Sequence, residues 1–486
     1  MNLFDIIKKE DIIKKDVVEE KTETCGFCCD TRNISRGETF FAISGEKFDG
    51  NAFIAEAYLK GAVAVVTDKE PTTRPPIPVI VIKNIRETFS RAVFFAAGDP
   101  QKKMKIIGVT GTNGKTTIAT ALHKIISDSG KKCALFTTIS YDVCGGEIYP
   151  SSHTTLPPEK LAPLLAEAYK NGAEYAVMEV SSHSLSQDRI SAIDFYIGIF
   201  TNITRDHLDY HKNIEEYTRA KAKLFEASEN SVINFDDERG KEIASYAKGK
   251  VFSVSKDENA DFRIKNPEIT ADGMSYELSG NGFEEKIDLC LNGSFNIYNT
   301  AECAAAAHIL GIDNKTVVAS LEKFKGVTGR MQKIFSDRLP YSLIIDYAHT
   351  PDALEKALRA CREITSGKLI CVFGCGGNRD KGKRHEMGEI ACSLSDLAVI
   401  TSDNPRNEAP EEIIHDIVKG LDGRFMNYKT VVDREKAIEY AMDIAKSGDT
   451  VILAGKGHED YIIDAFGKHH FSETETVGKI IEKKGL

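Results

Sequence analysis

The sequence predicts an α/β protein of three domains, and two observations lead to that prediction. The chain has 486 residues, which is too long for a single hydrophobic core and suits about three domains. Short apolar runs alternate with helical segments over most of its length, a pattern typical of mainly parallel, doubly wound sheets. We expect a small N-terminal α/β domain over 1–100, a central domain over 101–328 and a third domain over 329–486.

Strands are expected at β-rich apolar runs that are bounded by glycine, proline or helical segments. These runs lie at 39–44, 62–67, 78–82, 105–110, 175–180, 195–202, 342–347, 368–374, 397–402 and 450–455. Chemistry in open α/β sheets collects at the carboxyl ends of the strands. In the second and third domains, polar clusters follow these runs directly, so the functional side chains are expected there.

The composition excludes several classes of protein. The net charge is −10 and the basic residues are spread along the chain, which argues against nucleic-acid binding. No apolar run reaches the roughly 18–20 residues that span a bilayer, and the first residues lack the apolar core of a secretory signal. The 11 cysteines are odd in number and scattered, which fits a reducing, cytoplasmic compartment. A zinc site at Cys25, Cys28 and Cys29 would need a second pair of ligands, and none follows.

The stretch "GVTGTNGKTT" between a predicted strand and a predicted helix is interpreted as a phosphate-binding loop. Gly111 and Gly114 let the backbone fold round an anion, the helix amides point at phosphate, and Lys115 adds a positive charge. Thr116 is placed to offer its hydroxyl to Mg²⁺. Val109 breaks the strict spacing of the motif, and a glycine turn with an accidental lysine is the alternative. The choice between ATP and GTP stays open on these residues.

Acidic and imidazole side chains follow two further runs. Glu179 ends one, and Asp206, His207, Asp209 and His211 follow another. Carboxylates and imidazoles beside a nucleotide triphosphate fit a Mg²⁺ site. The alternative is that the histidines cap helices or pair with acids.

The helix predicted over 215–225 carries two lysines with different expected environments. Lys221 shares a face with apolar residues, and Lys223 lies about 200° round the helix, so Lys221 should point inward and Lys223 outward. An inward ammonium beside Mg²⁺ is electrostatically unfavourable. The amine could instead be neutral or carry a carbamate formed with CO₂, or it could extend its charged end back to solvent.

These motifs together resemble the Mur ligase family. The matches are "GTNGKTT", "MEVSSH", "TRDHLDYH", "YTRAKAKLF", "FNIYN", "GRM" and "DYAHTPD", in family order and over nearly the whole chain. Three more, "CDTR", "GCGGNRDKGKR" and "AGKGHEDY", resemble the members that add the third amino acid of the peptide. The resemblance implies an N-terminal domain that binds the UDP-sugar, a central phosphate-loop ATPase domain and a Rossmann-like C-terminal domain for the amino acid.

The resemblance also implies roles for individual residues. Catalysis would depend on Lys115, Glu179, His207 and a carbamylated Lys221 (N6-carboxylysine). Two Mg²⁺ ions would be held by Thr116, Glu179, His207 and Lys221. ATP would contact Gly111, Thr112, Asn113, Gly114, Lys115, Thr116, Thr117, Asn299, Arg330 and Asp346. The UDP-sugar dipeptide would contact Cys29, Thr31, Thr154, Thr155, Ser181, Gln187 and Arg189.

The amino-acid site implied by the resemblance contains "DNPR", which marks members that add meso-diaminopimelate. Its residues are Arg379, Asp403, Asn404, Pro405, Arg406, Gly455 and Glu459. Diaminopimelate has a second carboxylate that lysine lacks, and the guanidinium of Arg406 can bind it through two hydrogen bonds. Glu459 is expected to take the distal ammonium, and Pro405 to fix the backbone before Arg406. Without the resemblance, the eight residues "DNPRNEAP" at 403–410 read as a solvated turn.

The implied reaction is ATP-driven amide formation in cytoplasmic peptidoglycan precursor synthesis. The γ-carboxylate of D-glutamate attacks the γ-phosphate, and the amino acid then attacks the resulting acyl phosphate. We expect a monomer that binds only small molecules, with no nucleic acid and no membrane span. The alternatives are a ligase for L-lysine or another diamino acid, a folylpolyglutamate-type ligase, a phosphate-loop kinase or motor, and a nucleotide-gated binding protein.

Overall fold

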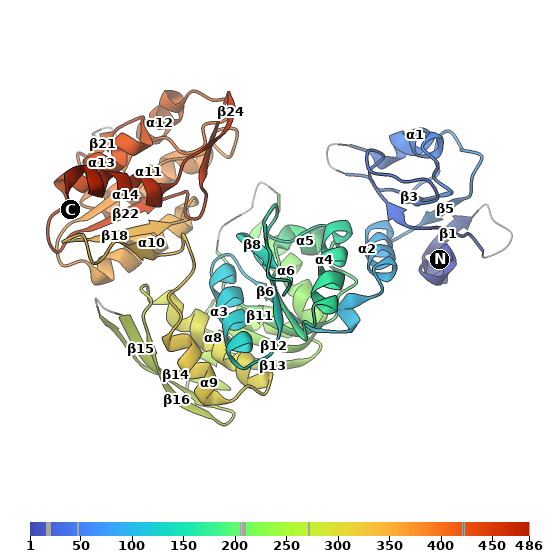
Figure 1. Ribbon diagram of the computed structural model, residues 1–486, viewed down its shortest axis with the longest axis horizontal. Helices are drawn as coiled ribbons and strands as arrows, with labels where there is room; N and C mark the ends of the chain where they lie inside the picture. Colours follow the sequence, from blue (N-terminus) through green and yellow to red (C-terminus); the bar gives the residue numbers. More distant parts are fainter. Residues whose placement is uncertain are drawn as a thin grey trace.

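The computed structural model describes residues 1–15, 21–45, 48–204, 206, 210–270, 273–419, 421 and 423–485. Three large sheets follow one another along this part of the chain, with a two-stranded hairpin near the C-terminus (Figure 1). Each large sheet is flanked by helices. The predicted α/β class is therefore confirmed.

The N-terminal sheet has the strand order β1-β5-β4-β3-β2. Its strands are β1 (Ile12–Lys15), β2 (Phe27–Cys28), β3 (Thr39–Ala42), β4 (Ala64–Thr67) and β5 (Val79–Ile82). Its helices are η1 (Leu3–Asp5), η2 (Lys9–Asp11), η3 (Gly50–Phe53), α1 (Ile54–Leu59) and α2 (Ile85–Ala96). The parallel strands β3, β4 and β5 are those that the sequence predicts. Alternate side chains pack on opposite faces: Phe41 and Val66 toward Phe89 of α2, and Phe40 toward Ile54 of α1.

The central sheet has 11 strands in the order β16-β15-β14-β13-β12-β11-β6-β10-β7-β8-β9. Its strands are β6 (Lys105–Thr110), β7 (Cys133–Phe136), β8 (Ser140–Asp142), β9 (Ile148–Pro150), β10 (Tyr175–Glu179), β11 (Phe195–Phe200), β12 (Ser228–Asn234), β13 (Lys250–Ser255), β14 (Phe262–Thr270), β15 (Gly273–Gly280) and β16 (Phe283–Leu289). From β14 to β7 in this sheet order, neighbouring strands are parallel, as predicted. The antiparallel strands at the two ends of the sheet were not predicted: β15 and β16 at one end, and β8 and β9 at the other.

Helices cover both faces of the central sheet. They are η4 (Pro100–Lys102), α3 (Lys115–Asp128), α4 (Pro158–Lys170), α5 (Ser182–Ser186), α6 (Ile214–Glu226), α7 (Gly240–Ser245), α8 (Phe295–Ile309) and α9 (Asn314–Glu322). Neighbouring residues of β6 enter different cores: Ile107 packs with α3, α8 and α9, and Ile106 with α4 and α6. Strand β6 is buried on both faces, which explains its continuous apolar sequence.

The C-terminal sheet has the order β17-β18-β22-β19-β20-β21, parallel except for β17. Its strands are β17 (Gln332–Ile334), β18 (Ser342–Asp346), β19 (Leu369–Phe373), β20 (Leu397–Ile400), β21 (Tyr428–Thr430) and β22 (Thr450–Ala454), and the hairpin is β23 (Tyr461–Asp464) with β24 (Gly467–His470). Its helices are α10 (Pro351–Ile364), α11 (Gly382–Leu394), α12 (Pro410–Val418), α13 (Arg434–Ile444) and α14 (Glu473–Lys484). All four predicted strands are present.

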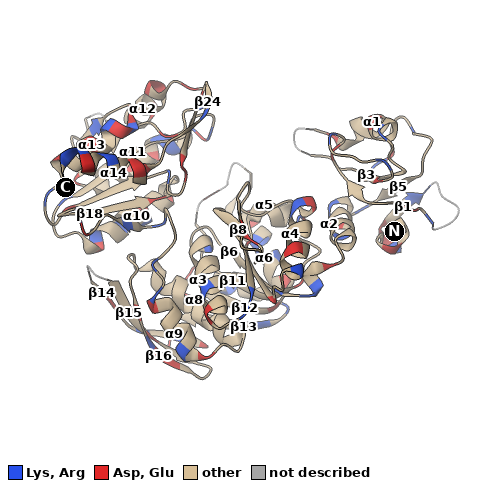
Figure 2. Cartoon of the chain, in the orientation of Figure 1, with Lys and Arg blue, Asp and Glu red and all other residues tan. Residues whose placement is uncertain are grey.

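Charged residues are distributed over all three parts of the molecule, with basic and acidic side chains interspersed (Figure 2). This distribution agrees with the scattered charge of the sequence. Among the described helices, none combines the length and the apolar character that a membrane crossing requires.

Candidate active site

The phosphate loop lies at the carboxyl end of β6, between the neighbouring strands β10 and β11. Gly111 has φ +149° and Gly114 has φ +88°, conformations that side chains disfavour. Space is also lacking: a Cβ on Gly111 would lie 1.8 Å from Thr201 Oγ1, and one on Gly114 would lie 2.5 Å from Asn299 Oδ1. Both glycines are therefore required by the shape of the loop.

Lys115 begins α3 and folds back over this loop. Its Nζ donates to the carbonyl oxygens of Gly111 and Thr112, each at 2.9 Å. Burial lowers the pKa of Lys115, while the nearby carboxylates of Glu179 and Asp206 oppose that shift. The amine thus lies at the centre of the loop, where a phosphate group would need a partner.

A cavity of about 430 Å³ opens in front of the loop, a size that suits a small-molecule site. Its lining comes from the loop, from α8 and from the start of the C-terminal unit. The predicted nucleotide residues among its lining are Thr112, Asn113, Gly114, Lys115, Thr116, Thr117, Asn299, Arg330 and Asp346. Gly111 is not among the lining residues, and its carbonyl accepts from Lys115 and Lys221.

Asp346 supports the wall of this cavity through backbone contacts. Its carboxylate accepts from the amides of Met331 at 2.7 Å and Ala348 at 2.8 Å. Burial raises the pKa of Asp346, and Arg330 and these amides act against that rise. The guanidinium of Arg330 lies 4.5 Å from the ring centre of Tyr347, a cation–π contact that orients it.

Glu179 and Thr116 supply oxygen atoms to the same cavity, the ligand type that Mg²⁺ prefers. The buried Glu179 accepts from the amide of Thr138 at 2.9 Å and from its hydroxyl at 3.1 Å. His207 and Asp209, which the sequence places near this site, lie outside the described residues. Within the described chain, no group of three acidic, histidine or cysteine side chains is arranged to hold a metal ion.

His211 was predicted to lie with the candidate Mg²⁺ ligands, and the structure shows which groups surround its ring. It is buried, and its Nε2 lies 3.0 Å from the hydroxyl of Ser182 at the start of α5. Its ring also packs against those of His183, Tyr210 and Tyr217. These contacts place His211 in a packed aromatic group.

Lys221 on α6 points inward and Lys223 outward, as helical spacing predicts. The side chain of Lys221 is 1% exposed, and its Nζ donates to the carbonyl of Gly111 at 2.8 Å. Lys223 is 40% exposed and pairs with Asp188 at 2.9 Å. Burial lowers the pKa of Lys221 well below its ordinary value, and the charge of Lys115 adds to the effect. The alternative in which Lys221 extends to solvent is wrong, because its amine is enclosed.

Five of the residues predicted to contact the UDP-sugar dipeptide form one group next to Glu179: Thr154, Thr155, Ser181, Gln187 and Arg189. The hydroxyl of Thr155 donates to the carbonyl of Glu179 at 2.9 Å and accepts from the amide of Ser181 at 2.9 Å. Arg189 donates to the carbonyl of Thr155 at 3.1 Å and to Gln187 Oε1. Thr154 lines the nucleotide cavity, so this group extends from the phosphate side outward.

Cys29 and Thr31 belong to the N-terminal unit and line neither of the two described cavities. Burial raises the pKa of the Cys29 thiol to about 12, and Glu159 of α4 adds to the rise. Thr31 is buried, and its carbonyl accepts from Lys60 Nζ at 2.9 Å. Cys29 is therefore a protonated thiol without the features of a reactive nucleophile.

A second cavity of about 970 Å³ lies over the carboxyl ends of the C-terminal strands. The predicted amino-acid residues that line it are Arg379, Asp403, Asn404, Arg406, Gly455 and Glu459. Pro405 is buried behind them. These six lining residues lie in the loops that follow β19, β20 and β22.

The "DNPR" loop is held in place by the β23 strand. Arg406 has φ +54°, and its amide donates to the carbonyl of Ile463 at 2.9 Å. Asn404 accepts from the amide of Ile463 at 2.9 Å and donates to Glu459 at 2.9 Å. The guanidinium of Arg406 donates to the carbonyl of Gly377 at 3.0 Å. These hydrogen bonds make the loop a fixed part of the cavity. The left-handed backbone conformation of Arg406 was missed by sequence analysis.

Two buried cations that contact residues lining this cavity were missed by sequence analysis. Lys456 is fully buried, and its Nζ lies 3.3 Å from Asn404 Oδ1 and 3.4 Å from Glu459 Oε2. The guanidinium of Arg384 is bound by both oxygens of Glu408, each at 3.0 Å. Lys456 lies in the motif "AGKGHEDY" and Arg384 in "GCGGNRDKGKR". Both motifs are rich in charge, and charged residues are ordinarily exposed, so their burial could not be predicted from the sequence.

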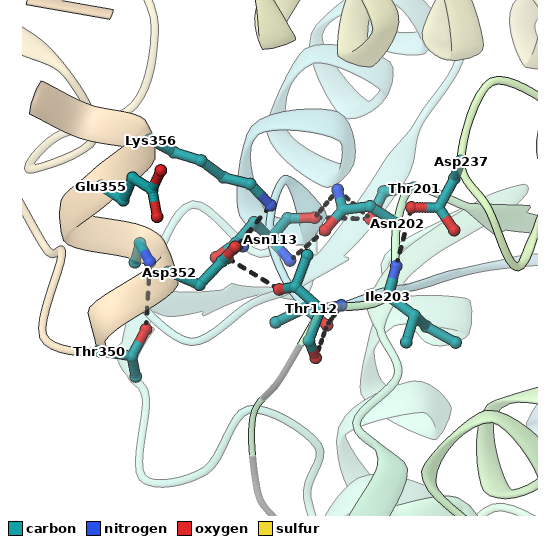
Figure 3. A network of polar contacts seen from close by, with 12 residues as sticks. Thr112, Asn113, Thr201, Asn202, Ile203, Asp237, Thr350, Asp352, Glu355 and Lys356 are labelled. Carbon is teal, nitrogen blue, oxygen red and sulfur yellow. Dashed lines mark hydrogen bonds and ion pairs between the residues drawn. The ribbon is translucent and has the colours of Figure 1, made fainter. Parts of the chain in front are cut away.

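A polar network joins the phosphate loop to the C-terminal unit (Figure 3). Asp352, in the first turn of α10, accepts from Asn113 Nδ2 at 2.7 Å and from the hydroxyl of Thr204 at 2.8 Å. Lys356 pairs with the same carboxylate at 3.1 Å. This carboxylate therefore lies directly beside the loop that is predicted to bind phosphate.

Comparison with protein families matches three successive parts of the chain. Residues 26–98 match "Mur ligase family, catalytic domain", 109–307 match "Mur ligase middle domain" and 329–457 match "Mur ligase, glutamate ligase domain". The stretches between the matched regions are 99–108 and 308–328.

Curated relatives match over nearly the full length. UDP-N-acetylmuramoyl-L-alanyl-D-glutamate–2,6-diaminopimelate ligase of Clostridium tetani is 42% identical over 99% of this chain and 100% of its own. The protein of the same name from Aquifex aeolicus is 40% identical over 95% of this chain and 94% of its own.

Solved structures give the same picture of the fold. A UDP-N-acetylmuramoyl-L-alanyl-D-glutamate–2,6-diaminopimelate ligase is 32% identical, covers 98% of both chains and has a TM-score of 0.71. Mycobacterium tuberculosis folylpolyglutamate synthase, solved with ADP and AMPPCP, is 19% identical, covers 76% of this chain and 92% of its own, and has a TM-score of 0.60. The second likeness concerns the fold alone.

Proposed function

This chain belongs to the Mur ligase family, and from that premise we propose that it uses ATP to join meso-diaminopimelate to UDP-N-acetylmuramoyl-L-alanyl-D-glutamate. The new amide forms at the γ-carboxylate of D-glutamate, and ADP and phosphate are released. One observation carries the proposal: Asp206, Tyr347, His349 and Thr350 line both cavities. A nucleotide at the phosphate loop and an amino acid beside Arg406 would therefore meet at one place, as a ligation requires.

The phosphate side of the site supplies positive charge where two anions must approach each other. A carboxylate and a triphosphate repel, so the reaction depends on groups that offset this repulsion. Lys115, the amides at the start of α3 and Arg330 surround the cavity in front of the loop. They hold the transferred phosphate and stabilise the charge that develops on it, which is the main task of a protein in phosphoryl transfer.

Mg²⁺ fits the donor atoms of this cavity. Thr116 and Glu179 offer a hydroxyl and a carboxylate, and by family resemblance His207 would join them. When bound, Mg²⁺ draws negative charge away from the phosphate oxygens. The hydrogen bonds from Thr138 to Glu179 fix the orientation of that carboxylate before any ion arrives.

The environment of Lys221 supports its carbamylation. Reaction with CO₂ requires a neutral amine and releases one proton as the N–C bond forms. Burial and the adjacent Lys115 both favour the neutral amine. The product is an anion, which would attract the positive charge of Lys115 and supply oxygen ligands for Mg²⁺.

The amino-acid cavity offers opposite charges at separate points. Arg406 and Arg379 can bind carboxylates, and Asp403 and Glu459 can bind an ammonium. Meso-diaminopimelate carries two of each charge, whereas L-lysine lacks the second carboxylate. An unpaired guanidinium beside a bound lysine would be costly, so the cavity favours diaminopimelate.

We also propose the cellular and structural setting of the reaction. The UDP end of the substrate would bind at the N-terminal sheet near Cys29 and Thr31. All 11 cysteines are unpaired, which supports a reducing cytoplasm. The active unit would be a monomer.

The direct test supplies the purified protein with UDP-N-acetylmuramoyl-L-alanyl-D-glutamate, ATP, Mg²⁺ and either meso-diaminopimelate or L-lysine. ADP release and tripeptide product should appear with diaminopimelate and depend on all three substrates.

Arg406→Ala should lower kcat/KM for diaminopimelate by about 100-fold, with little change in ATP binding. Asn407→Ala, at the exposed neighbouring position, is the matched control. Equal use of both amino acids by the wild type and the Arg406 variant would contradict the proposed specificity.

A further inference from the structure

Lys456 is a buried cation to which the proposed reaction gives no role. It follows β22 in the turn "GKG", its side chain is 0% exposed, and it is not among the residues that line the amino-acid cavity. Gly455 and Gly457 on either side have φ +117° and +56°, backbone conformations that glycine adopts most easily. This turn carries the lysine side chain inward, behind the wall of the cavity.

The ammonium of Lys456 lies among three acceptors that belong to this wall. Its Nζ is 3.3 Å from Asn404 Oδ1, 3.4 Å from Glu459 Oε2 and 3.8 Å from Asp403 Oδ1. All three acceptor residues line the cavity. A buried ammonium is stable only where such groups surround it. The loops after β20 and β22 are therefore joined by this cation, from behind the site.

Lys456 decides which way the side-chain amide of Asn404 faces. The two ends of that amide have nearly the same shape but opposite hydrogen-bonding character. Its oxygen accepts from the backbone amide of Ile463 at 2.9 Å and from Lys456, and its nitrogen donates to Glu459 Oε2 at 2.9 Å. In the reversed orientation, the NH₂ group would face two donors and the oxygen would face a carboxylate. Each of these contacts would then be unfavourable.

This orientation matters because Asn404 lines the cavity beside Glu459. An NH₂ group has two N–H donors, and the contact with Glu459 uses one of them. The other suits a carboxylate of the amino acid. The positive charge of Lys456 also lies close to Asp403 and Glu459, so it offsets part of the negative charge on this side of the cavity. A substrate carboxylate can therefore approach a wall that carries two acids.

We propose that Lys456 is a positioning residue for the incoming amino acid. It holds Asn404 with its NH₂ group toward Glu459 and the cavity, where that group donates to a carboxylate of diaminopimelate. Lys456 itself stays behind the wall and acts through Asn404. The inference rests on the proposed use of diaminopimelate, and it adds a residue that prepares the site before the substrate arrives.

A double-mutant cycle on the full-length protein separates this role from a structural one. The readout is the rate of tripeptide formation, with diaminopimelate varied and the other substrates saturating. Lys456→Met keeps the length of the side chain and removes the ammonium. It should raise KM for diaminopimelate about tenfold, with kcat and KM for ATP nearly unchanged. Asn404→Ala should raise the same KM by at least about tenfold. Because Lys456 acts through Asn404, the double variant should exceed Asn404→Ala by no more than about twofold.

Lys468→Met is the matched control. The Nζ of Lys468 lies 3.7 Å from the ring centre of Tyr461, and that of Lys456 lies 5.7 Å from the same ring. Lys468 is exposed on β24, so its replacement should leave KM for diaminopimelate at the wild-type value. Thermal melting shows whether each variant is folded. Lys456→Gln, which keeps a donor without the charge, repeats the cycle if the methionine variant does not fold.

The outcomes distinguish the two proposals. If Lys456→Met keeps the wild-type KM, or if its effect multiplies with that of Asn404→Ala, Lys456 does not act through Asn404 and the inference is overturned. Equal rises in KM for diaminopimelate and for ATP, or the failure of both Lys456 variants to fold, would assign the lysine to the fold alone and overturn it as well. If the wild type forms no tripeptide with diaminopimelate, the proposed function fails first, and this inference fails with it.

Discussion

Lys221 places an amine in the interior, 2.8 Å from the carbonyl of Gly111 and close to the positive charge of Lys115. If it becomes a carbamate, its replacement removes both an anion and the ligands that anion provides. Lys221→Ala should therefore lower kcat by about 100-fold, and a short-chain carboxylic acid added to the assay should restore part of the activity.

Lys223→Ala is the matched control for this prediction, since the residue lies on the same helix but pairs with Asp188 at the surface. It should keep nearly full activity and show no response to the added acid. A Lys221→Ala enzyme with near wild-type kcat would contradict the carbamate.

Sequence analysis could place Lys221 because the helical period alone decides which face a residue occupies. It could not identify Lys456 as buried. This lysine lies in a segment where the local pattern permits exposure, and its burial comes from an element that is distant in the chain, the "DNPR" loop. Contacts of this kind depend on the tertiary fold and leave no local periodicity.

At the scale of elements, the carboxylate of Glu408 holds two loops of the amino-acid cavity together. Glu408 follows "DNPR" and accepts from Arg384 of α11 and from the amide of Asn378. Arg384 also binds Asp416 of α12 at 2.7 Å. The Glu408–Arg384 pair therefore fixes the segment that contains Gly377. The carbonyl of Gly377 accepts from Arg406 and so orients its guanidinium.

Breaking this pair should affect the amino acid more than the nucleotide. Glu408→Gln keeps the shape and weakens the charge-assisted hydrogen bonds. We expect KM for diaminopimelate to rise about tenfold and KM for ATP to change little, measured by initial rates with one substrate varied at a time. Glu411→Gln, at an exposed site on α12, is the control. Equal increases in both KM values would indicate general loosening of the domain.

The parallel strands β6, β10 and β11 could be predicted because each is a continuous apolar run, but the more polar parallel strands β12, β13 and β14 and the antiparallel flank of the central sheet were missed. Its signal was present: β15 and β16 are joined by Asn281 and Gly282, with φ +51° and +86°. Positive φ at both positions is the signature of a tight hairpin turn, and Asn-Gly is its favoured sequence. The alternating polar residues of β16 agree with a sheet that is solvated on one side.

At the scale of the whole molecule, Asp352 joins the C-terminal unit to Asn113 of the phosphate loop (Figure 3). It also accepts from Thr204 in the segment after β11. A sequence can show that both motifs exist, but which side chains meet across two units depends on how the units are oriented. The contact has a consequence for binding, because a triphosphate in the loop brings negative charge close to this carboxylate.

Nucleotide binding should therefore work against this contact. Asp352→Asn keeps a hydrogen-bonding side chain and removes the charge, so ATP should bind more tightly by about three- to tenfold in calorimetry. Glu355→Gln removes a charge one turn along α10 without a contact to the loop, and should leave ATP affinity nearly unchanged. Weaker ATP binding by Asp352→Asn would show that the carboxylate assists the nucleotide.

The same reasoning predicts a change of shape during the reaction. The three substrates bind on three units of one chain, and their reacting atoms must come within bonding reach, so the C-terminal unit should close over the central one when nucleotide and dipeptide substrate are both present. Solution scattering should then show a smaller radius of gyration than for the free protein. Asp352→Ala, which removes the tie to the loop, should widen the distribution of shapes in the free protein and still compact with both ligands. A radius that does not change with the ligands would mean that the units already hold their working arrangement, and that Asp352 belongs to the closed state.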